Sequence, residues 1–266
     1  MESKIDLRLG DCLEIMKCMQ TESVDLTVTS PPYDNLRTYN GNIEQWTFEK
    51  FQEIAKELYR VTKKGGAVVW VVGDSTVKGS ETGTSFRQAL CFKEIGFNLH
   101  DTMIYQKKTP PKTHNRYEQE FEYMFVLSKG KPKTFNPILI PKKYMDKRTN
   151  KAFGRNKTDE HDLGYSSKNK DRIKGNIWEY LVGGGKTTKD KIAYQHPAIF
   201  PDKLAYDHII SWSNEGDTVL DCFMGSGTTG KMAKLLNRNF IGIEIDKQYF
   251  EIAKERICGA TPQGNA

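Results

Sequence analysis

The chain has 266 residues, with 40 Lys and Arg against 34 Asp and Glu and a formal net charge of +6. That length suits one large α/β domain or one domain with an insertion. No run of about 18 uncharged apolar residues occurs, so no transmembrane helix is expected. The N-terminus has no apolar leader segment, and the five cysteines are scattered without CxxC spacing. These features predict a cytoplasmic protein with reduced thiols and no metal site.

Strand and helix patterns alternate through the first 128 residues. Residues 48–61 carry apolar side chains at helical spacing, and residues 67–72 form the continuous apolar run that is typical of a buried parallel strand. Further strands are predicted at 4–9, 24–29, 98–105 and 121–127, and further helices at 13–19 and 86–95. After residue 191, helices are predicted at 203–213, 229–236 and 248–257, and strands at 218–221 and 240–244. Alternating βα units predict a mostly parallel sheet covered on both faces.

The segment 129–191 breaks this alternation and holds the positive charge. It contains 17 Lys and Arg against 7 Asp and Glu, a net of +10, whereas the rest of the chain has 23 against 27, a net of −4. Concentrated positive charge with interleaved aromatic residues is typical of a phosphate-binding surface, although a solvated, Lys-rich insertion is the alternative. The predicted organisation is one domain built from residues 1–128 and 192–266, with 129–191 as a basic insertion.

A glycine-rich turn follows the predicted strand at 218–221. The sequence from Asp221 to Gly230, DCFMGSGTTG, contains G-x-G-x-x-G, and Glu244 lies 19 residues after Gly225 at the end of the next strand. Glycines let the backbone approach a ligand closely, and a carboxylate at this spacing accepts hydrogen bonds from ribose hydroxyls. The combination predicts a cofactor with an adenosine half.

Two other nucleotide-binding folds fit this turn less well. A nicotinamide-binding fold begins with such a turn and needs several βα units after it, but only 22 residues follow Glu244. No G-x-x-x-x-G-K-[ST] sequence is present, which excludes a P-loop. The rest of the sheet must therefore come from the N-terminal half, so the order of elements is circularly permuted.

The sequence Thr-Ser-Pro-Pro-Tyr at 29–33 follows a predicted strand end, where α/β sheets place their sites. Two prolines fix the backbone and so position the groups beside them. Ser30 and the carbonyl of Ser30 or Pro31 are suited to accept hydrogen bonds from an amino group, and Tyr33 is suited to stack on a flat ring. A Pro-rich turn with an exposed tyrosine is the structural alternative.

This motif set resembles the DNA amino-methyltransferases, which act at cytosine N4 or adenine N6. Residues 30–33 resemble their catalytic S/D/N-P-P-Y/F motif, and residues 221–227 resemble their cofactor motif. Residues 196–201, HPAIFP, resemble the cofactor motif that precedes it, and 120–129 resembles the strand and K-G turn that close their catalytic half. Catalytic motif, basic variable segment and cofactor motif follow in the order of the β class, and the resemblance covers nearly the whole chain outside 129–191.

The resemblance implies an α/β fold of the Rossmann-like, S-adenosylmethionine-dependent methyltransferase type, with an antiparallel edge strand and an inserted target-recognition region at 129–191. It implies S-adenosyl-L-methionine as cofactor and double-stranded DNA as partner, and it leaves open a homodimer, a cognate restriction endonuclease and the recognition sequence. The residues assigned to catalysis are Ser30, Pro31, Pro32 and Tyr33. Those assigned to the cofactor are Asp11, Thr29, His196, Pro201, Asp221, Cys222, Phe223, Gly225, Ser226, Gly227 and Glu244. Candidates for DNA contacts are Arg148, Arg155 and Arg172, because Arg pairs bidentately with guanine.

The residue at position 30 bears on the target base. In the resembling family, Ser here accompanies mostly cytosine N4 and Asp mostly adenine N6, so cytosine N4 is the expected target and adenine N6 the alternative. A protein glutamine methyltransferase has a similar loop, but there the cofactor motif precedes the loop and Asn replaces the Ser. A non-catalytic nucleic-acid-binding protein with a decayed cofactor site is disfavoured by the intact Asp221, Glu244 and Ser30.

Overall fold

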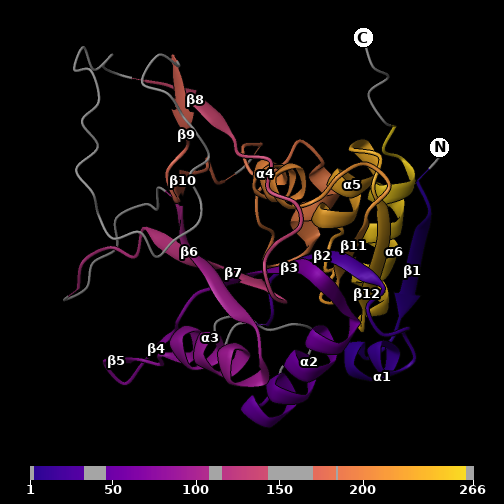
Figure 1. Cartoon of the computed structure of the whole chain (residues 1–266), viewed down its shortest axis with the longest axis horizontal. Helices are drawn as coiled ribbons and strands as arrows, with labels where there is room; N and C mark the ends of the chain where they lie inside the picture. The colour runs from indigo at the N-terminus through magenta and orange to yellow at the C-terminus, as the bar shows by residue number, and fades with distance from the viewer. Residues whose placement is uncertain (1–2, 33–45, 108–115, 143–169, 184, 262–266) are drawn as a thin grey trace. The chain divides into compact units, whose positions relative to one another are not determined.

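The computed structural model describes residues 3–32, 46–107, 116–142, 170–183 and 185–261 (Figure 1). The chain forms two compact units: a large one, Met1–Asn136 with Asn176–Ala266, and a small one, Pro137–Gly175. Within the described ranges, no helix combines the length and the apolar character that a membrane span needs.

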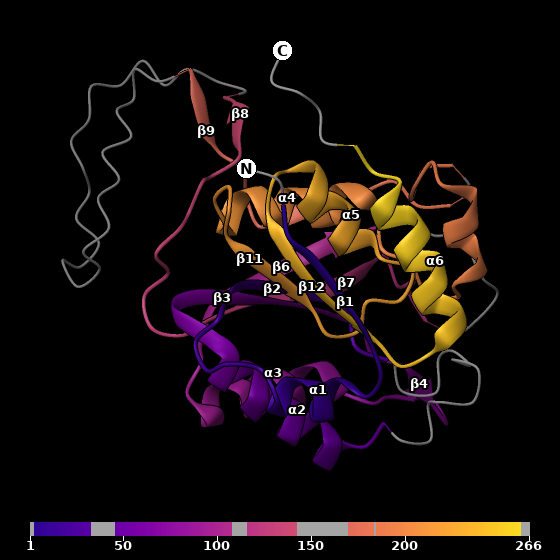
Figure 2. The same cartoon turned by 90° about the vertical axis from the view of Figure 1, so that its right-hand side faces the viewer.

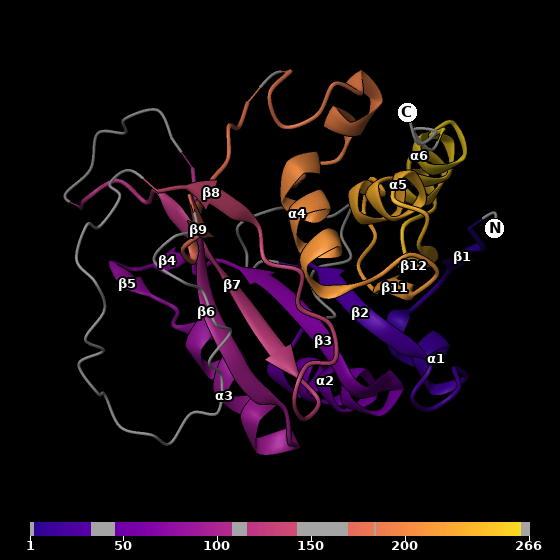
Figure 3. The same ribbon diagram turned by 45° about the horizontal axis from the view of Figure 1, so that its top comes forward.

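A mixed sheet forms the middle layer of the large unit, and eight strands of it lie in the described residues, in the order β1-β12-β11-β2-β3-β7-β6-β10. Figure 3 shows the strands of this order from β1 to β6. The strands from β1 to β3 in this order are parallel to one another. β7 runs antiparallel to both β3 and β6, and β10 runs parallel to β6. Their bounds are β1 (Ile5–Leu9), β2 (Val24–Thr29), β3 (Thr62–Val72), β6 (Asn98–Gln106), β7 (Phe121–Ser128), β10 (Ile177–Glu179), β11 (Thr218–Asp221) and β12 (Asn239–Glu244).

Helices cover both faces of this sheet (Figure 2). One layer holds α1 (Cys12–Lys17), α2 (Phe48–Val61) and α3 (Thr84–Ile95). The other holds α4 (Asp202–Trp212), α5 (Thr228–Leu235) and α6 (Lys247–Cys258). A 3₁₀ helix, Lys191–Gln195, precedes α4, and a small hairpin, β4 (Thr76–Val77) with β5 (Ser80–Glu81), follows β3. The three-layer α/β architecture with a mostly parallel sheet is therefore confirmed.

Helix α2 shows how the local sequence specifies its element. Thr47 caps the helix, because its side-chain oxygen accepts from the Lys50 backbone N–H at 3.2 Å. Its apolar residues recur at helical spacing, and Phe51, Ile54 and Leu58 are fully buried. They pack with Trp70 and Phe92 in the core between the sheet and this helix layer.

Strand β3 begins earlier than the sequence pattern indicates. Residues 62–66 include Lys63, Lys64 and two glycines, so only 67–72 reads as an apolar strand. The structure extends the strand because the backbone of Gly65 donates to the Lys129 carbonyl at 2.7 Å and Lys129 donates back to Gly66 at 3.1 Å. Pairing across the sheet overrides the weak local preference of these polar and glycine residues.

The predicted antiparallel edge strand is wrong in its position. The antiparallel strand is β7, which lies between β3 and β6 inside the sheet. After β3, the chain crosses over through α3 to form β6 one place further out, and β7 then returns into the space left beside β3. Among the described residues, the strand at the β6 end of the sheet is β10, which comes from the segment expected to be an insertion and pairs in parallel with β6.

The small unit contains a short antiparallel pair, β8 (Leu139–Pro141) and β9 (Asp171–Ile173). Arg172 lies exposed on β9. The compact unit starts at Pro137 and ends at Gly175. It is therefore shorter at both ends than the basic segment 129–191, whose flanking residues belong to the large unit.

Candidate active site

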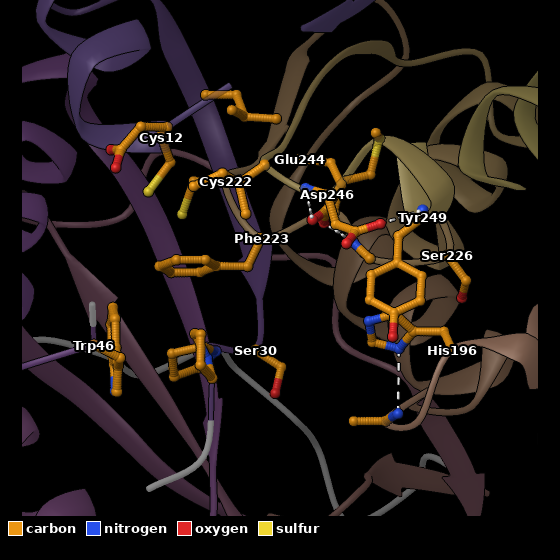
Figure 4. Close-up of a pocket in the computed structure, with 18 of the residues that line it drawn as sticks. Cys12, Ser30, Trp46, His196, Cys222, Phe223, Ser226, Glu244, Asp246 and Tyr249 are labelled. Carbon is orange, nitrogen blue, oxygen red and sulfur yellow. Dashed lines mark hydrogen bonds between the residues drawn. The ribbon is translucent and has the colours of Figure 1, made fainter. Parts of the chain in front are cut away.

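A pocket opens at the carboxyl ends of the parallel strands β1, β2, β11 and β12 (Figure 4). Sites collect at this edge in α/β sheets because the loops that leave neighbouring parallel strands meet there. The lining residues come from these loops, from α2 and from the stretch before α4. They are Gly10, Asp11, Cys12, Ser30, Pro31, Pro32, Trp46, Lys50, Ile54, His196, Ala198, Ile199, Phe200, Cys222, Phe223, Met224, Gly225, Ser226, Thr228, Ile243, Glu244, Ile245, Asp246 and Tyr249.

Glu244, the last residue of β12, contributes a carboxylate to the lining of this pocket. One carboxylate oxygen accepts from the Gly225 N–H at 2.7 Å, and the other accepts from the Asp246 N–H at 2.9 Å. Burial raises the pKa of Glu244, while these two backbone hydrogen bonds act in the opposite direction. A carboxylate has about four acceptor positions, so the two oxygens retain capacity for a pair of ligand hydroxyls.

The glycine-rich turn between β11 and α5 needs glycine at Gly225 for two reasons. Its φ of +52° lies in the left-handed region, which disfavours most side chains. A Cβ there would also lie 3.0 Å from His196 Nε2. The His196 ring packs edge-on against Tyr249, with centroids 4.4 Å apart, and its Nδ1 accepts from the Ala198 N–H at 3.2 Å. His196 therefore closes the pocket over the turn.

Asp221 joins the glycine-rich turn to the Ser30 loop from behind the pocket. It is only 1% exposed, and its carboxylate accepts from the Thr29 hydroxyl at 2.7 Å and from the Phe223 N–H at 3.1 Å. Burial raises the pKa of Asp221 to about 6, and hydrogen bonds from Thr29, Thr229 and Phe223 oppose that rise. Because β2 and β11 are neighbours in the sheet, this one carboxylate fixes both loops relative to each other.

Asp11 stands at the end of β1 and pairs with a lysine from the opposite helix. Its side chain caps α1 by accepting from the Leu13 N–H at 2.8 Å, and it forms an ion pair with Lys50 Nζ at 2.5 Å. Partial burial raises the pKa of Asp11, but the hydrogen bonds from Lys50 and Leu13 outweigh it and lower the pKa overall. Asp11 is therefore held as an anion that faces the pocket.

Aromatic and aliphatic side chains form an apolar wall beside these polar groups. The Trp46 and Phe223 rings meet edge to face with centroids 5.4 Å apart (Figure 4). Ile54, Ile243 and Ile245 complete this part of the lining. Apolar walls with a few convergent acceptors suit a planar heterocycle joined to a sugar.

A second pocket lies against the first, and four residues line both: Ser30, Ala198, Ile199 and Phe200. We call these four residues the shared wall. The second pocket is completed by Tyr105, Lys107, Glu122, Val182, Gly183, Thr187 and Pro197. Ser30 is thus exposed to two adjoining cavities, as a group acting between two bound molecules must be.

A buried ion cluster holds the shared wall in place. Arg256, whose side chain is 1% exposed, pairs with Asp190 at 3.1 Å and with Asp202 at 3.3 Å. These two aspartates flank the part of the shared wall at 198–200 in sequence. Arg256 also donates to the Ser226 carbonyl at 2.5 Å, in the cofactor-motif turn. Lys231 from α5 pairs with the same two aspartates. The cluster therefore fixes the wall to the turn that lines the first pocket.

The structure brings most of the residues predicted from sequence into the first pocket. Asp11, Ser30, Pro31, Pro32, His196, Cys222, Phe223, Gly225, Ser226 and Glu244 all line it. Thr29, Pro201, Asp221 and Gly227 are not in its lining, and their cofactor contacts stay predictions; Thr29 and Asp221 act on it through the hydrogen bonds described above. Tyr33, Arg148 and Arg155 lie outside the described residues.

Sequence reasoning missed several lining residues that carry no motif. Trp46 and Lys50 approach from around the start of α2, and Asp246 and Tyr249 from the start of α6. Asp246 caps α6 by accepting from the Gln248 and Tyr249 N–H groups, and that capping pattern right after Glu244 is a usable signal. Lys107 and Glu122 of the second pocket belong to no sequence motif. Lys107 lies just after β6 and Glu122 lies within β7, so only the pairing of these strands brings the two side chains together.

The charges of the first pocket indicate what it takes. Among the described lining residues, the acidic side chains are Asp11, Glu244 and Asp246, and the one Lys or Arg is Lys50. Carboxylates favour a ligand that carries positive charge as well as hydroxyl donors. A ribose-bearing cofactor with a cationic group fits this donor and charge set, and a di- or triphosphate would be repelled. Fold and site together define an α/β protein with a pocket suited to a positively charged nucleoside.

Comparison with known proteins identifies the family. The family model of the N6/N4 methylases, described as DNA methylase, matches residues 24–255. The orphan methyltransferase M.BamHII of Bacillus amyloliquefaciens is 57% identical over 257 residues, which cover 94% of this chain and 90% of the relative. The chain therefore belongs to the N6/N4 DNA methylase family and is a DNA amino-methyltransferase.

Solved structures show the same fold. TTHA0409 of Thermus thermophilus, complexed with S-adenosyl-L-methionine, is 27% identical, with a TM-score of 0.65 over 97% of this chain and 96% of that chain. The cytosine-N4-specific PvuII DNA methyltransferase superposes with a TM-score of 0.72 over 96% of this chain and 87% of that chain, at 21% identity. The fold is thus that of the S-adenosylmethionine-dependent methyltransferases, in the permuted order expected from the sequence.

Proposed function

We propose that this protein transfers a methyl group from S-adenosyl-L-methionine to the exocyclic N4 of cytosine within a specific sequence of double-stranded DNA. The observation that carries the proposal is the position of Ser30, which lines both the pocket suited to the cofactor and the pocket beside it. A methyl donor and a methyl acceptor in these two cavities would meet at this residue.

The first pocket supports S-adenosylmethionine by the chemistry of its lining. Glu244 offers carboxylate oxygens for the ribose hydroxyls, the apolar wall that includes Trp46 and Phe223 suits a flat purine, and the surplus of carboxylates suits a cationic ligand. Asp11 would accept from the adenine amino group. When bound, S-adenosylmethionine supplies an electrophilic methyl group on a positively charged sulfur.

The residues around Ser30 would orient the acceptor amino group. A base must leave the duplex stack before its amino group can reach a buried partner. The Ser30 hydroxyl and the carbonyl of Ser30 or Pro31 would accept hydrogen bonds from its two N–H groups. This favours a pyramidal nitrogen, whose lone pair is less delocalised into the ring. The protein's main contribution is alignment, which in favourable cases lowers a barrier by about 7–11 kcal/mol.

Ser30 favours cytosine over adenine as the target. An aspartate at this position accepts through a full charge, whereas a serine hydroxyl is a neutral acceptor that also donates. It therefore accepts from the amino group or donates to the neighbouring ring nitrogen. In the wider family Ser at this position accompanies mostly cytosine N4, and adenine N6 is the alternative outcome.

The target atom is testable directly. Unmethylated genomic DNA treated with the purified protein and S-adenosylmethionine, then hydrolysed to nucleosides, should yield N4-methyldeoxycytidine by mass spectrometry. The Ser30→Ala protein serves as the matched control for contaminating methylases. N6-methyldeoxyadenosine without N4-methyldeoxycytidine would refute the choice of cytosine and leave the fold and cofactor assignments standing.

The basic segment 129–191 supplies the second half of the proposal, which is DNA binding with sequence readout. Its net charge of +10 suits contacts to phosphates, and Arg172 on β9 presents an exposed guanidinium. Arg148 and Arg155 remain candidates from the sequence. The compact unit Pro137–Gly175 within this segment is a natural unit of exchange.

An exchange experiment tests this role. We expect that replacing Pro137–Gly175 with the corresponding segment of a relative that methylates a different site will transfer that relative's recognition sequence, because base readout follows the groups that enter the grooves. Methylated positions would be mapped by sequencing. DNA affinity should also fall steeply with salt, as expected for several phosphate contacts.

A hybrid that folds, binds the cofactor and still methylates the original sequence would contradict the assignment. Cofactor affinity measured by calorimetry distinguishes this outcome from a hybrid that has lost its fold.

A further inference from the structure

The second pocket holds a pair of opposite charges that the proposed chemistry has not yet used. Lys107 Nζ forms an ion pair with Glu122 Oε1, and both side chains line the pocket. They are largely buried, with side-chain exposures of 21% and 14%. The remaining polar groups that its described lining contributes, Ser30 aside, include the Tyr105 hydroxyl and Thr187.

The sheet explains why this pair lies opposite Ser30. Thr29, one residue before Ser30, pairs with Trp70 on β3, and two residues further along β3 Val72 pairs with Tyr123 on β7. Because β7 runs antiparallel to β3, Glu122, which precedes Tyr123, lies beside Gly73, which follows Val72. A Cβ on Gly73 would lie 3.3 Å from Glu122 Cγ. The pocket is therefore spanned by the ends of neighbouring strands, about 4.8 Å apart in the hydrogen-bonding direction.

Lys107 enters the pocket from the far side, where β6 ends. Its backbone N–H donates to the Glu120 carbonyl at 2.8 Å, which anchors the residue beside the start of β7. Its ammonium lies 5.9 Å from the centroid of the Tyr105 ring and is held by Glu122. A largely buried cation is costly unless it is paired, and the ion pair with Glu122 holds the Lys107 side chain in place.

The acceptor pattern of the target base matches this cation. With the amino group at Ser30, a flat ring extends into the second pocket. The ring nitrogen beside the amino group, N3 in cytosine or N1 in adenine, is an acceptor and cannot donate. The carboxylate of Glu122 also only accepts and cannot serve that nitrogen, whereas the lysine ammonium only donates.

Resting on the proposed function, we infer that Lys107 donates a hydrogen bond to the ring nitrogen adjacent to the methylated amino group of the extruded base, and that Glu122 is the positioning residue for Lys107. In cytosine the O2 atom, a second acceptor, lies next to this nitrogen, where adenine presents a C–H group. At this edge, cytosine therefore offers one more acceptor to a hydrogen-bond donor than adenine does.

An atom-deletion experiment tests the contact. DNA containing the mapped site is made with cytosine or with 3-deazacytosine, which replaces the N3 acceptor by C–H, at the target position. For the wild-type protein we expect kcat/KM to fall by about 10- to 150-fold on the analogue, the range for one hydrogen bond to a charged group. Lys107→Met should lower kcat/KM by a similar factor on cytosine DNA and show no further loss on the analogue.

Non-additivity of the two changes is the decisive result, because it arises only when the side chain and the atom interact. The analogue also changes the intrinsic reactivity of the amino group. That change is the same for the wild-type and Lys107→Met proteins, so it cancels when their losses are compared. Additive losses, or a wild-type protein insensitive to the analogue, would overturn the inference.

Three further measurements protect this test. Lys107→Met removes the ammonium that pairs with Glu122 and keeps the carboxylate, so the Lys107→Met/Glu122→Gln double variant is run beside it to remove both charges. Lys254→Met removes an exposed lysine on α6 and controls for lost DNA attraction. The cofactor Kd should be unchanged in every variant, since neither Lys107 nor Glu122 lines the first pocket.

The design separates this inference from the choice of base. If nucleoside analysis finds N6-methyldeoxyadenosine, the cytosine proposal fails, and the same cycle is run with 1-deazaadenine at the target. Non-additive losses in that cycle would support the Lys107 contact, and additive losses would overturn it.

Discussion

Replacing Ser30 by alanine should lower kcat by about 100- to 1000-fold while changing the cofactor Kd little. The structure places Ser30 between two pockets, where its hydroxyl would accept from the amino group as positive charge develops on that nitrogen. Removing one preorganised hydrogen-bonding group from a transition state costs this much in other enzymes. Single-turnover methylation with labelled cofactor gives the rate, and calorimetry gives the Kd.

The hydroxyl can be tested apart from the fold of the loop. Ser30→Thr retains a hydroxyl and should recover part of the lost rate, whereas Ser30→Ala retains the two prolines and the Thr29–Asp221 hydrogen bond that hold the loop. Wild-type turnover in Ser30→Ala would remove Ser30 from the chemistry. A parallel loss of cofactor affinity would instead indicate that the alanine has disturbed the first pocket.

The second large effect is expected at Glu244, where alanine should raise the Kd for S-adenosylmethionine at least about 100-fold. Two ribose hydrogen bonds to a charged acceptor contribute about 1.5–3 kcal/mol each, and each 1.4 kcal/mol is a factor of ten. The change also deprives the Gly225 and Asp246 N–H groups of their partner, which loosens the turn. Glu244→Gln keeps the shape of the side chain and removes the charge, so its Kd for S-adenosylmethionine should lie between those of the wild-type and Glu244→Ala proteins.

Glu244 should also make cofactor binding depend on pH. Burial raises the pKa of Glu244 above its ordinary value of 4.5. A protonated carboxyl accepts fewer hydrogen bonds, so the affinity should be full above this raised pKa and should fall as the pH drops through it. Glu244→Gln should lack this dependence. An equal pH dependence in Glu244→Gln, or an unchanged Kd in Glu244→Ala, would contradict the assignment.

Much of the fold and site was predictable because short-range signals carried it. The apolar spacing of residues 48–61 predicts α2 with the bounds that the structure has, and Thr47 caps it. DCFMGSGTTG followed by Glu244 predicts a nucleoside site, since strand, turn and carboxylate are local features whose spacing is set by one βα unit. The Ser30 loop precedes the glycine-rich turn in the chain, and this order of motifs already indicated the permuted arrangement.

Only the tertiary structure decided which strands became neighbours and which side chains met. β7 lies inside the sheet because the crossover through α3 left a space beside β3, and β10 adds an edge strand from a segment without strand pattern. The Lys107–Glu122 pair and the Arg256 cluster with Asp190 and Asp202 join residues from separate elements. Sequence periodicity reports which face of an element is buried. It does not report the partner across the sheet, because pairing is set by the packing of the whole chain.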